Sequence, residues 1–441
     1  MRNRWTDREA AWCVEQYGAR WGEALALRTY VSRLLGVEPG LVLHGGGNAS
    51  VKASWSTVLG EDVPAIFVKA SGFDMAAIEP AGHPALDLAP LGRLRALDAL
   101  DDAAMVNEVR RALFDAGGPN PSIETLVHAF LPAAFVDHTH ADAILTLTNQ
   151  QGGRALVAEA LGDGVGILDY VEPGFALAKA VSAAAGDGRA IRGLVLMHHG
   201  LITWGESAKA SYDAHIDLVT QAEQFIDARV RKGATVAVPA RVDEQTWNRL
   251  ALTAPILRGQ LARATGDGDR PWDRVVLAPI VTDEMLALLG GPGAKDALVT
   301  PVLTTDHLIR TKNLPLWVDA PAWDDPAVFK AQVRDAVQQY AAAYGAYLVR
   351  HRGGLHEQLA EFDPLPRVVL LPGKEMERHS TKDNEEMLIF LKGTGRVILG
   401  TETITMEENQ ALYIPPQTEH EIHNDGPAEL RYIYTVAPAG R

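Results

Sequence analysis

The sequence predicts an α/β domain with a central β-sheet flanked by helices, followed by a mostly helical extension and a small all-β barrel of the jelly-roll type. Three observations predict this organisation. Apolar runs typical of buried strands alternate with helical patterns along residues 1–235. Residues 236–362 have mostly helical spacing and are expected to contribute one polar loop. Residues 363–441 contain short alternating runs separated by Gly and Pro, which is typical of a β-barrel.

Length and composition define the class of protein. The chain has 441 residues, 47% of them hydrophobic and 22% charged, which is ordinary for a globular protein of two or three domains. Lys and Arg total 41 against 56 Asp and Glu, so the formal net charge is −15. This charge provides no general attraction for nucleic acid or for an anionic membrane. An anionic substrate would therefore need a local basic or amide-lined pocket.

Cysteine content and the N-terminal residues predict the compartment. Cys13 is the only cysteine, which excludes an intramolecular disulfide and favours a reducing environment. Residues 1–9 are charged and lack the apolar core of a signal peptide, and no run of about eighteen apolar residues occurs. We therefore expect a cytoplasmic protein.

The first elements lead to a glycine turn. Residues 9–36 have apolar side chains at helical spacing and are expected to pack as one or two amphipathic helices. Leu41–Leu43 and the residues after Asn48 are expected to be two strands joined by the turn Gly45–Gly47. Three glycines allow backbone N–H groups to converge on an anion, and Gly47 and Asn48 are the candidate contacts. A plain hairpin turn is the alternative.

A second polar turn is expected at the end of the next strand. Residues 66–74 are predicted as a strand that ends in Ser71 and Gly72, which can supply a hydroxyl and an amide to the same anion. Other glycine motifs fit less well, because no lysine follows at P-loop spacing and Ser50 stands where a dinucleotide fingerprint needs Gly. Residues 44–47 are similar to an esterase oxyanion loop, but the chain has no G-x-S-x-G nucleophile elbow.

Glu124 is the candidate acid or base. Ser122 is expected to be the N-cap of a helix, which places Glu124 in the first helical turn. Acidic residues are favoured there by the helix dipole alone, which is the structural alternative. The functional interpretation is a carboxylate that moves a proton, or exchanges as a ligand, next to a metal ion. His128, one turn later, is expected to be mainly structural.

Three histidines form a candidate metal site. Residues 135–139 alternate as a strand, so His138 and His140 should point to the same face. A second apolar strand, Gly193–Met197, ends in two histidines and should deliver a third imidazole. Three His ligands with one open position are typical of catalytic zinc. A polar strand face without metal is the alternative.

The stretch from Thr304 to Lys312 is the densest polar segment of the middle part. It contains Asp306, His307, Arg310 and Lys312 beside apolar residues. His307, Arg310 and Lys312 are candidate contacts to a phosphorylated ligand, although a surface loop has the same composition.

Together, the motifs resemble the class II aldolase/adducin family. They are Gly47-Asn48-Ala49-Ser50, Lys69-Ala70-Ser71-Gly72, Pro121-Ser122-Ile123-Glu124, His138-Thr139-His140 and His198-His199-Gly200-Leu201, in the family's order. The resemblance implies that His138, His140 and His199 bind zinc. It also implies that Glu124 is the catalytic acid/base and that the turns at Asn48 and Ser71-Gly72 hold a substrate phosphate. His199 is preferred to His198 because the family's ligand directly precedes the glycine.

The match is similar to the aldolase half of bifunctional rhamnulose-1-phosphate aldolase/lactaldehyde dehydrogenase proteins over about residues 1–350. It implies a ketose 1-phosphate aldolase that yields dihydroxyacetone phosphate and an aldehyde, and a homo-oligomer, by resemblance a tetramer. The same scaffold also serves epimerases and a dehydratase, which are alternatives. Where those proteins continue into a dehydrogenase, this chain has the β-barrel instead. An adducin-type scaffold without activity is disfavoured because the histidine set is intact.

The C-terminal part resembles a cupin. Its predicted strands are 367–371, 387–392, 395–399, 401–405, 411–414 and 430–435. Residues that match cupin motifs are Gly373, His379, Glu386, Gly393, Pro415, His420 and Asn424, whereas Thr381 and Gln417 replace an expected His and Gly. His379, Glu386 and His420 are a possible second metal set. A cupin that isomerises or senses a sugar, or one that only binds sugar or supports oligomers, is the alternative.

Overall fold

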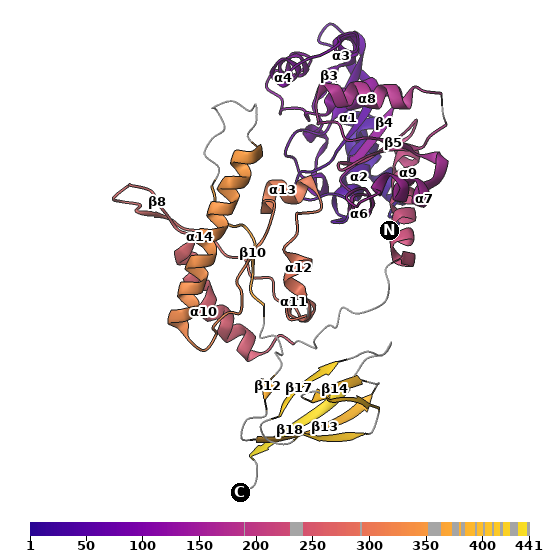
Figure 1. The fold of residues 1–441 in the computed structure, drawn as a ribbon. Coiled ribbons are helices and arrows are strands. Elements are labelled where there is room, and N and C mark those ends of the chain that lie inside the picture. The colour runs from indigo at the N-terminus through magenta and orange to yellow at the C-terminus, as the bar shows by residue number, and fades with distance from the viewer. Residues whose placement is uncertain are drawn as a thin grey trace. The chain divides into compact units, whose positions relative to one another are not determined.

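The computed structural model divides into two compact units (Figure 1), Met1–Arg231 with Val302–Asn313, and Lys232–Pro301 with Leu314–Arg441. The structure describes residues 1–188, 190–229, 241–291, 293–351, 363–372, 379–380, 384–392, 395–399, 402–407, 410–414, 418–423 and 431–438. The predicted boundaries at 235 and 362 fall outside the described residues and stay predictions.

The described part of the first unit is built on a seven-stranded sheet in the order β3-β2-β1-β4-β7-β6-β5. The strands are β1 (Asn48–Ser56), β2 (Asp62–Val68), β3 (Ala85–Asp87), β4 (Phe135–Thr139), β5 (Gly166–Leu168), β6 (Gly193–Leu196) and β7 (Gly200–Gly205). β5 and β6 pair in parallel, and the other neighbours are antiparallel. The strands that carry the candidate site, β1, β4 and β7, are therefore the middle of the sheet.

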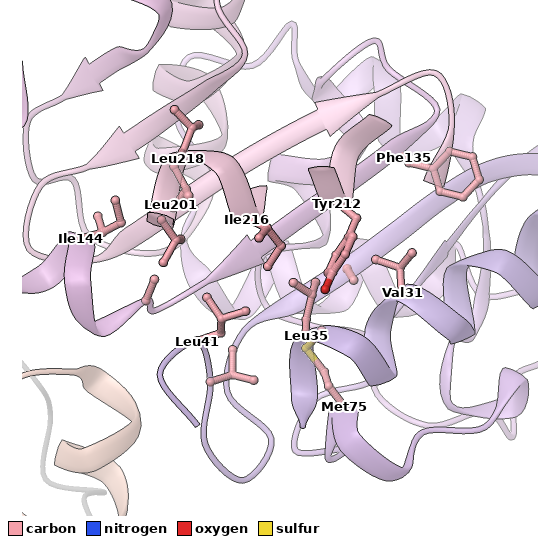
Figure 2. Close-up of a cluster of buried hydrophobic side chains, with 14 of the residues drawn as sticks. Val31, Leu35, Leu41, Met75, Phe135, Ile144, Leu201, Tyr212, Ile216 and Leu218 are labelled. Carbon is pink, nitrogen blue, oxygen red and sulfur yellow. The ribbon is translucent and has the colours of Figure 1, made fainter. Parts of the chain in front are cut away.

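Helices cover both faces of this sheet. The described helices of this unit are α1 (Asp7–Trp21), α2 (Glu23–Gly36), α3 (Leu88–Leu94), α4 (Asp102–Arg111), α5 (Thr125–Phe130), α6 (Asp142–Thr148), α7 (Gly153–Leu161), α8 (Phe175–Ala185), α9 (Ala208–Arg229) and α13 (Thr305–Thr311), of which α13 has no residue in the apolar clusters of the two faces. Figure 2 shows the apolar cluster on one face, which includes Leu35 and Tyr212. The opposite cluster includes Phe130 of α5 and Phe175 of α8. The fold class predicted for this domain is confirmed.

The alternation of β4 decides which face carries the site. Phe135 packs in the cluster of Figure 2, and Val136 packs in the opposite cluster. Because successive side chains of a strand point to opposite faces, His138 lies on the same face as Val136, where α5 packs. Asp137 points to the other face. The apolar core thus fixes the direction of the candidate metal ligand.

Asp137 forms a buried ion pair that should support β4. Its Oδ1 accepts from Arg28 Nη2 at 2.5 Å, its Oδ2 accepts from Ser211 Oγ at 2.5 Å, and both charged side chains are fully buried. Asp137→Asn is expected to lower the free energy of unfolding by about 3–5 kcal/mol, because the guanidinium stays buried without its charge partner. Urea unfolding curves measure this change.

The exposed pair of Arg192 and Asp217 provides the control for that measurement. Both side chains are about half exposed, so Asp217→Asn should cost at most about 1 kcal/mol. An Asp137→Asn protein as stable as the Asp217→Asn control would contradict the assignment.

The second unit has a helical part with its own core. Its helices are α10 (Glu244–Gln260), α11 (Asp283–Leu289), α12 (Ala294–Leu298) and α14 (Pro326–His351), and it also contains the short strands β8 (Arg263–Ala264) and β9 (Trp272–Asp273). Leu257 of α10 and Phe329 of α14 are members of one apolar cluster. Within the described residues, no helix is both long and apolar enough to cross a membrane.

The strand predicted at 367–371 is present, but it does not pair with the other described C-terminal strands. Val369–Leu370 form β11, which pairs in parallel with β10 (Leu316–Trp317) rather than with the barrel. The physical reason is burial, because Leu365, Val369 and Leu371 pack against the helical cluster that contains Phe329. These apolar residues belong to the core of the helical part.

The C-terminal strands form two sheets among the described residues, in the orders β12-β17-β14-β15 and β16-β13-β18. The strands are β12 (His379–Ser380), β13 (Asn384–Lys392), β14 (Gly395–Leu399), β15 (Glu402–Met406), β16 (Ala411–Ile414), β17 (Glu419–His423) and β18 (Arg431–Pro438). Within each sheet the neighbours are antiparallel. The predicted all-β C-terminal domain is confirmed.

Candidate metal centre

Neighbouring strands bring the three histidines together. His138 of β4 lies opposite Asn48 of β1 and opposite Ile202 of β7. The β6–β7 hairpin presents His199 in its turn, directly before Gly200. A Cβ on Gly200 would lie 2.3 Å from the Thr139 carbonyl oxygen, so only glycine permits this approach of the hairpin to β4.

The imidazoles of His138, His140 and His199 face a common centre. Their ring centroids are separated by 4.9 to 5.4 Å, and one nitrogen from each ring lies within 4.8 Å of the others. His138 and His199 are buried, and His140 is partly buried. His198, in contrast, is exposed, and its Nδ1 lies 3.1 Å from Asn149 Oδ1.

Hydrogen bonds at Nδ1 leave Nε2 lone pairs pointing inward. His138 Nδ1 donates to the Leu201 carbonyl at 3.0 Å, and His140 Nδ1 donates to Asp306 Oδ1 at 2.7 Å. The two Nε2 atoms are 3.2 Å apart. Burial holds the pKa of His138 well below its usual value, and with Nδ1 bonded to the Leu201 carbonyl its Nε2 carries the lone pair.

This arrangement fits a bound cation. Two nitrogen lone pairs at 3.2 Å repel unless a positive charge lies between them. Two metal–nitrogen bonds of 2.0–2.1 Å at a tetrahedral angle place the nitrogens about 3.3 Å apart. The residues present therefore suit a divalent metal with His138, His140 and His199 as ligands.

Glu124 lies against the same centre. Its Oε2 is 3.4 Å from His138 Nε2, and its Oε1 is 3.3 Å from His199 Nε2. Burial alone would raise the pKa of Glu124, but the neighbouring His138 and His199 and the hydrogen bond from the Asn48 amide lower it below its usual value. Among the described residues, the buried Oε1 has no hydrogen-bond partner.

The prediction that Ser122 caps the helix was wrong. Helix α5 begins at Thr125, and Glu124 itself is the N-cap residue. Ser122 Oγ accepts from the Glu124 amide at 3.2 Å, and the Ser122 carbonyl accepts from the Thr125 amide at 3.0 Å, which forms a turn before the helix. Glu124 is therefore held at the helix N-terminus with its side chain directed to the metal centre.

A chain of hydrogen bonds orients the Glu124 carboxylate. Asn48 Nδ2 donates to Glu124 Oε2 at 2.6 Å, and Asn48 Oδ1 accepts from His128 Nε2 at 2.5 Å. Ser50 Oγ then donates to His128 Nδ1 at 2.8 Å. Burial lowers the pKa of His128 to about 4, which agrees with a neutral ring in this chain. Asn48, predicted as a phosphate contact, here positions Glu124.

Leu41–Leu43, predicted as a strand, is a turn that continues from α2. The amides of Leu41 and Val42 both donate to the Glu38 carbonyl, and the Leu43 amide donates to Asp306 Oδ2 at 2.9 Å. The backbone amides of residues 41–43 thus find acceptors in the preceding turn and in α13. Leu41 and Val42 can therefore be buried without strand pairing.

The glycine turn and the Ser71-Gly72 turn are adjacent. A Cβ on Gly45 would lie 2.8 Å from the Gly72 carbonyl oxygen. Lys69 Nζ donates to the Gly45 carbonyl at 2.8 Å, and burial lowers the pKa of this lysine to about 8. Ser71 is exposed, and its amide donates to the Asn120 carbonyl.

The predicted polar loop at 304–312 is a helix. Thr304 caps α13, because its Oγ1 accepts from the His307 amide at 3.3 Å and bonds His307 Nδ1 at 2.7 Å. Arg310 Nη2 donates to the His44 carbonyl at 2.5 Å. Lys312 is buried at the end of the helix, with φ of 66°. The assignment of His307, Arg310 and Lys312 to a phosphate stays a prediction.

Sequence reasoning missed the role of Asp306. This residue, 5% exposed, bonds His140 directly although 166 positions separate the two in sequence. A histidine that binds a metal through one ring nitrogen commonly donates the N–H of the other nitrogen to a carboxylate. The sequence signal that could have pointed to Asp306 was therefore the expectation of an acidic partner for each candidate histidine. Sequence spacing alone did not distinguish Asp306 from its polar neighbours.

The second metal set stays a prediction. The strand pairing places His379 opposite His420, and His420 is buried. Glu386 lies on β13 opposite Ile414. Four residues that match cupin motifs, Gly373, Gly393, Pro415 and Asn424, lie outside the described residues, as do the two departures, Thr381 and Gln417.

Comparison with known families agrees with the geometry. Residues 27–226 match the model for the class II aldolase and adducin N-terminal domain, and residues 248–390 match the second domain of class II aldolases. Residues 366–436 match the cupin domain. The front of this chain belongs to the class II aldolase/adducin family. The class II aldolase domain contains the histidine centre, and the cupin is a separate C-terminal domain.

Among curated relatives, the chain is 30% identical over 349 residues to "Uncharacterized oxidoreductase YuxG" of Bacillus subtilis (strain 168), covering 78% of this chain and 49% of that protein. The chain thus spans about half the length of this relative. A solved class II aldolase domain from Thermoplasma acidophilum is 38% identical, with a TM-score of 0.46, and covers 51% of this chain and 99% of its own. An L-fuculose-1-phosphate aldolase from Thermus thermophilus is 20% identical, with a TM-score of 0.31, and covers 48% and 97%.

Proposed function

We propose that the chain is a zinc-dependent aldolase that cleaves or forms the carbon–carbon bond of a ketose 1-phosphate similar to rhamnulose 1-phosphate. The products of cleavage would be dihydroxyacetone phosphate and an aldehyde. The observation that carries the proposal is the pair of Nε2 atoms of His138 and His140, which face each other at 3.2 Å with Glu124 beside them. Three imidazoles leave coordination positions for substrate oxygens, as in catalytic zinc sites.

His138, His140 and His199 would hold the zinc, which would supply Lewis-acid polarisation of the substrate oxygens and stabilisation of developing negative charge. Glu124 moves the proton to and from the carbon next to the carbonyl. Its lowered pKa keeps the carboxylate ionised at neutral pH, and its buried Oε1, 3.3 Å from His199 Nε2, has no hydrogen bond among the described residues, which supports Oε1 as the atom that accepts the proton. Asn48 holds Oε2 and thereby fixes the direction of Oε1.

The adjacent glycine turns are the proposed phosphate site. Ser71 offers an exposed hydroxyl, and Gly72 lies next to the turn that contains Gly47. The bond from Arg310 to the His44 carbonyl keeps a guanidinium beside this turn and supports a role in charge neutralisation. Phosphate binding here would hold the substrate without taking part in the chemistry.

Product analysis tests the reaction class. The zinc-loaded protein is expected to convert dihydroxyacetone phosphate and an aldehyde into a ketose 1-phosphate, with a new C–C bond visible by carbon-13 NMR. The reverse reaction should release both fragments. Inversion at one carbon, or loss of water with the skeleton intact, would contradict the aldolase proposal and support an epimerase or a dehydratase.

The remaining expectations are part of the same proposal. We propose a homo-oligomer with a cytoplasmic location and small-molecule sugar phosphate partners. The second metal at His379, Glu386 and His420 is retained as a prediction for the cupin domain.

A further inference from the structure

The segment Val302–Asn313 belongs to the first unit although the residues on both sides belong to the second. Its two ends meet, because the Val302 amide donates to the Asn313 carbonyl at 3.2 Å. Between these ends lies α13. The segment is therefore a closed excursion of the chain that enters and leaves the first unit at one place.

This segment contacts the metal centre through Asp306 and through Thr305, whose Oγ1 lies 3.2 Å from His140 Nδ1. Its Oδ1 accepts from His140 Nδ1 at 2.7 Å, and its Oδ2 accepts from the Leu43 amide at 2.9 Å. A Cβ on Gly46 would lie 2.1 Å from both carboxylate oxygens, so the carboxylate rests directly on the glycine turn. Asp306 thus joins a metal ligand to the proposed phosphate turn.

Helix capping does not account for this acid. Thr304, not Asp306, is the N-cap of α13 and accepts from the His307 amide. The side-chain bonds of Asp306 described above go to His140 and Leu43, which are far away in sequence, and Asp306 is the nearer of the two residues of α13 that contact His140 Nδ1, at 2.7 Å against 3.2 Å for Thr305 Oγ1. Its position is consequently explained by the groups around the metal centre.

Two more contacts hold the segment at its ends. At the start, Asn149 Nδ2 donates to the Leu303 carbonyl at 2.9 Å, and Asn149 Oδ1 lies 3.1 Å from Nδ1 of His198, the residue before His199. At the far end, Arg310 Nη2 donates to the His44 carbonyl at 2.5 Å. The bond of Asp306 to His140 and the contact of Leu303 with Asn149, which lies beside the turn of His199, thus place the segment near two of the three candidate ligands.

We propose that residues 302–313 are a clamp whose docking and metal binding stabilise each other, with Asp306 as the positioning residue of His140. The inference rests on the proposed function only in requiring a divalent cation at the histidine centre. Asp306 fixes the His140 tautomer and ring direction, so that Nε2 faces the ion. Because linkage is reciprocal, metal bound at Nε2 must in turn favour the docked clamp.

Zinc affinity of the full chain tests the first half of this linkage. Asp306→Asn keeps the size of the side chain but replaces one carboxylate oxygen with an NH2 group. This donor would face either the Leu43 amide or the His140 N–H, both of which are donors, so one of the two hydrogen bonds is lost. Competition with a chromophoric chelator should show a zinc Kd raised about 10- to 100-fold. Ile309→Ala, at a residue of the same helix that is 77% exposed, is the control and should leave the Kd unchanged.

Hydrogen exchange tests the second half. Zinc should slow exchange of the amides in residues 302–313 of the parent chain, and this difference should disappear in Asp306→Asn. Arg310→Ala removes the contact to the His44 carbonyl while keeping Asp306, and it should weaken zinc binding in the same direction. Circular dichroism verifies that each variant is folded.

The outcomes separate this inference from the proposed function. If the parent binds zinc and folded Asp306→Asn and Arg310→Ala bind it equally well, or if zinc leaves exchange in 302–313 unchanged, the clamp is refuted and the aldolase proposal stands. If the parent chain binds no divalent metal, the proposed function itself is refuted.

Discussion

Glu124→Gln is expected to keep the metal and to lower turnover by about 10²- to 10⁴-fold, the range that a positioned acid or base contributes. The amide preserves the shape of the side chain and can still accept from Asn48, whose Nδ2 lies 2.6 Å from Oε2. It cannot take a proton at Oε1. Because the loss concerns proton transfer, we expect kcat to fall while the affinity for dihydroxyacetone phosphate changes little.

The measurement is steady-state cleavage of the ketose 1-phosphate together with metal content by elemental analysis. Glu15→Gln is the matched control, since Glu15 is exposed on α1. Full activity in Glu124→Gln would refute its role as acid/base. Loss of metal together with activity would show instead that Glu124 serves mainly as a ligand.

His138→Ala is expected to lose bound zinc and cleavage activity together. His138 is buried, its Nε2 is 3.2 Å from that of His140, and its Nδ1 is fixed by the Leu201 carbonyl. Removing a direct ligand should reduce zinc affinity by more than the roughly 10- to 100-fold that a change in an outer partner produces. Elemental analysis after dialysis measures the metal retained per chain.

The two histidines of the β6–β7 turn provide the matched pair for this experiment. His199→Ala should lose zinc as His138→Ala does, because its ring faces the common centre. His198→Ala should retain zinc, since the exposed His198 bonds Asn149 instead. An active, metal-free His138→Ala protein would refute the metal-dependent mechanism.

The strand pattern allowed much of this centre to be predicted. Alternation along Phe135–Thr139 is a local property, and it correctly placed His138 on one face of β4. The run Gly193–Leu196 likewise indicated the strand that leads to His199. Alternation at every second residue also predicted strands in the class II aldolase domain and in the cupin domain, because one face of each strand is buried. Glycine and proline predicted the turns between these strands.

The contacts that complete the site could not be predicted in this way. Asp306 and His140 are 166 positions apart, and Asn48 and Glu124 are 76 apart, so no spacing rule connects them. The position of Asn48 beside the glycine turn predicts a phosphate contact, whereas in the structure both ends of its side-chain amide are bonded within the protein. Leu41–Leu43 has the composition of a strand but is held by turn bonds to Glu38 and a side-chain bond to α13.

The placement of Val302–Asn313 in the first unit has a consequence for biosynthesis. A ribosome that has released residues 1–231 has delivered all three candidate ligands, yet Asp306, the carboxylate bonded to His140, is still 306 − 231 = 75 codons away. Maturation of the centre therefore waits for sequence that lies beyond the catalytic sheet, and a nascent or prematurely terminated polypeptide carries the histidines without their outer support.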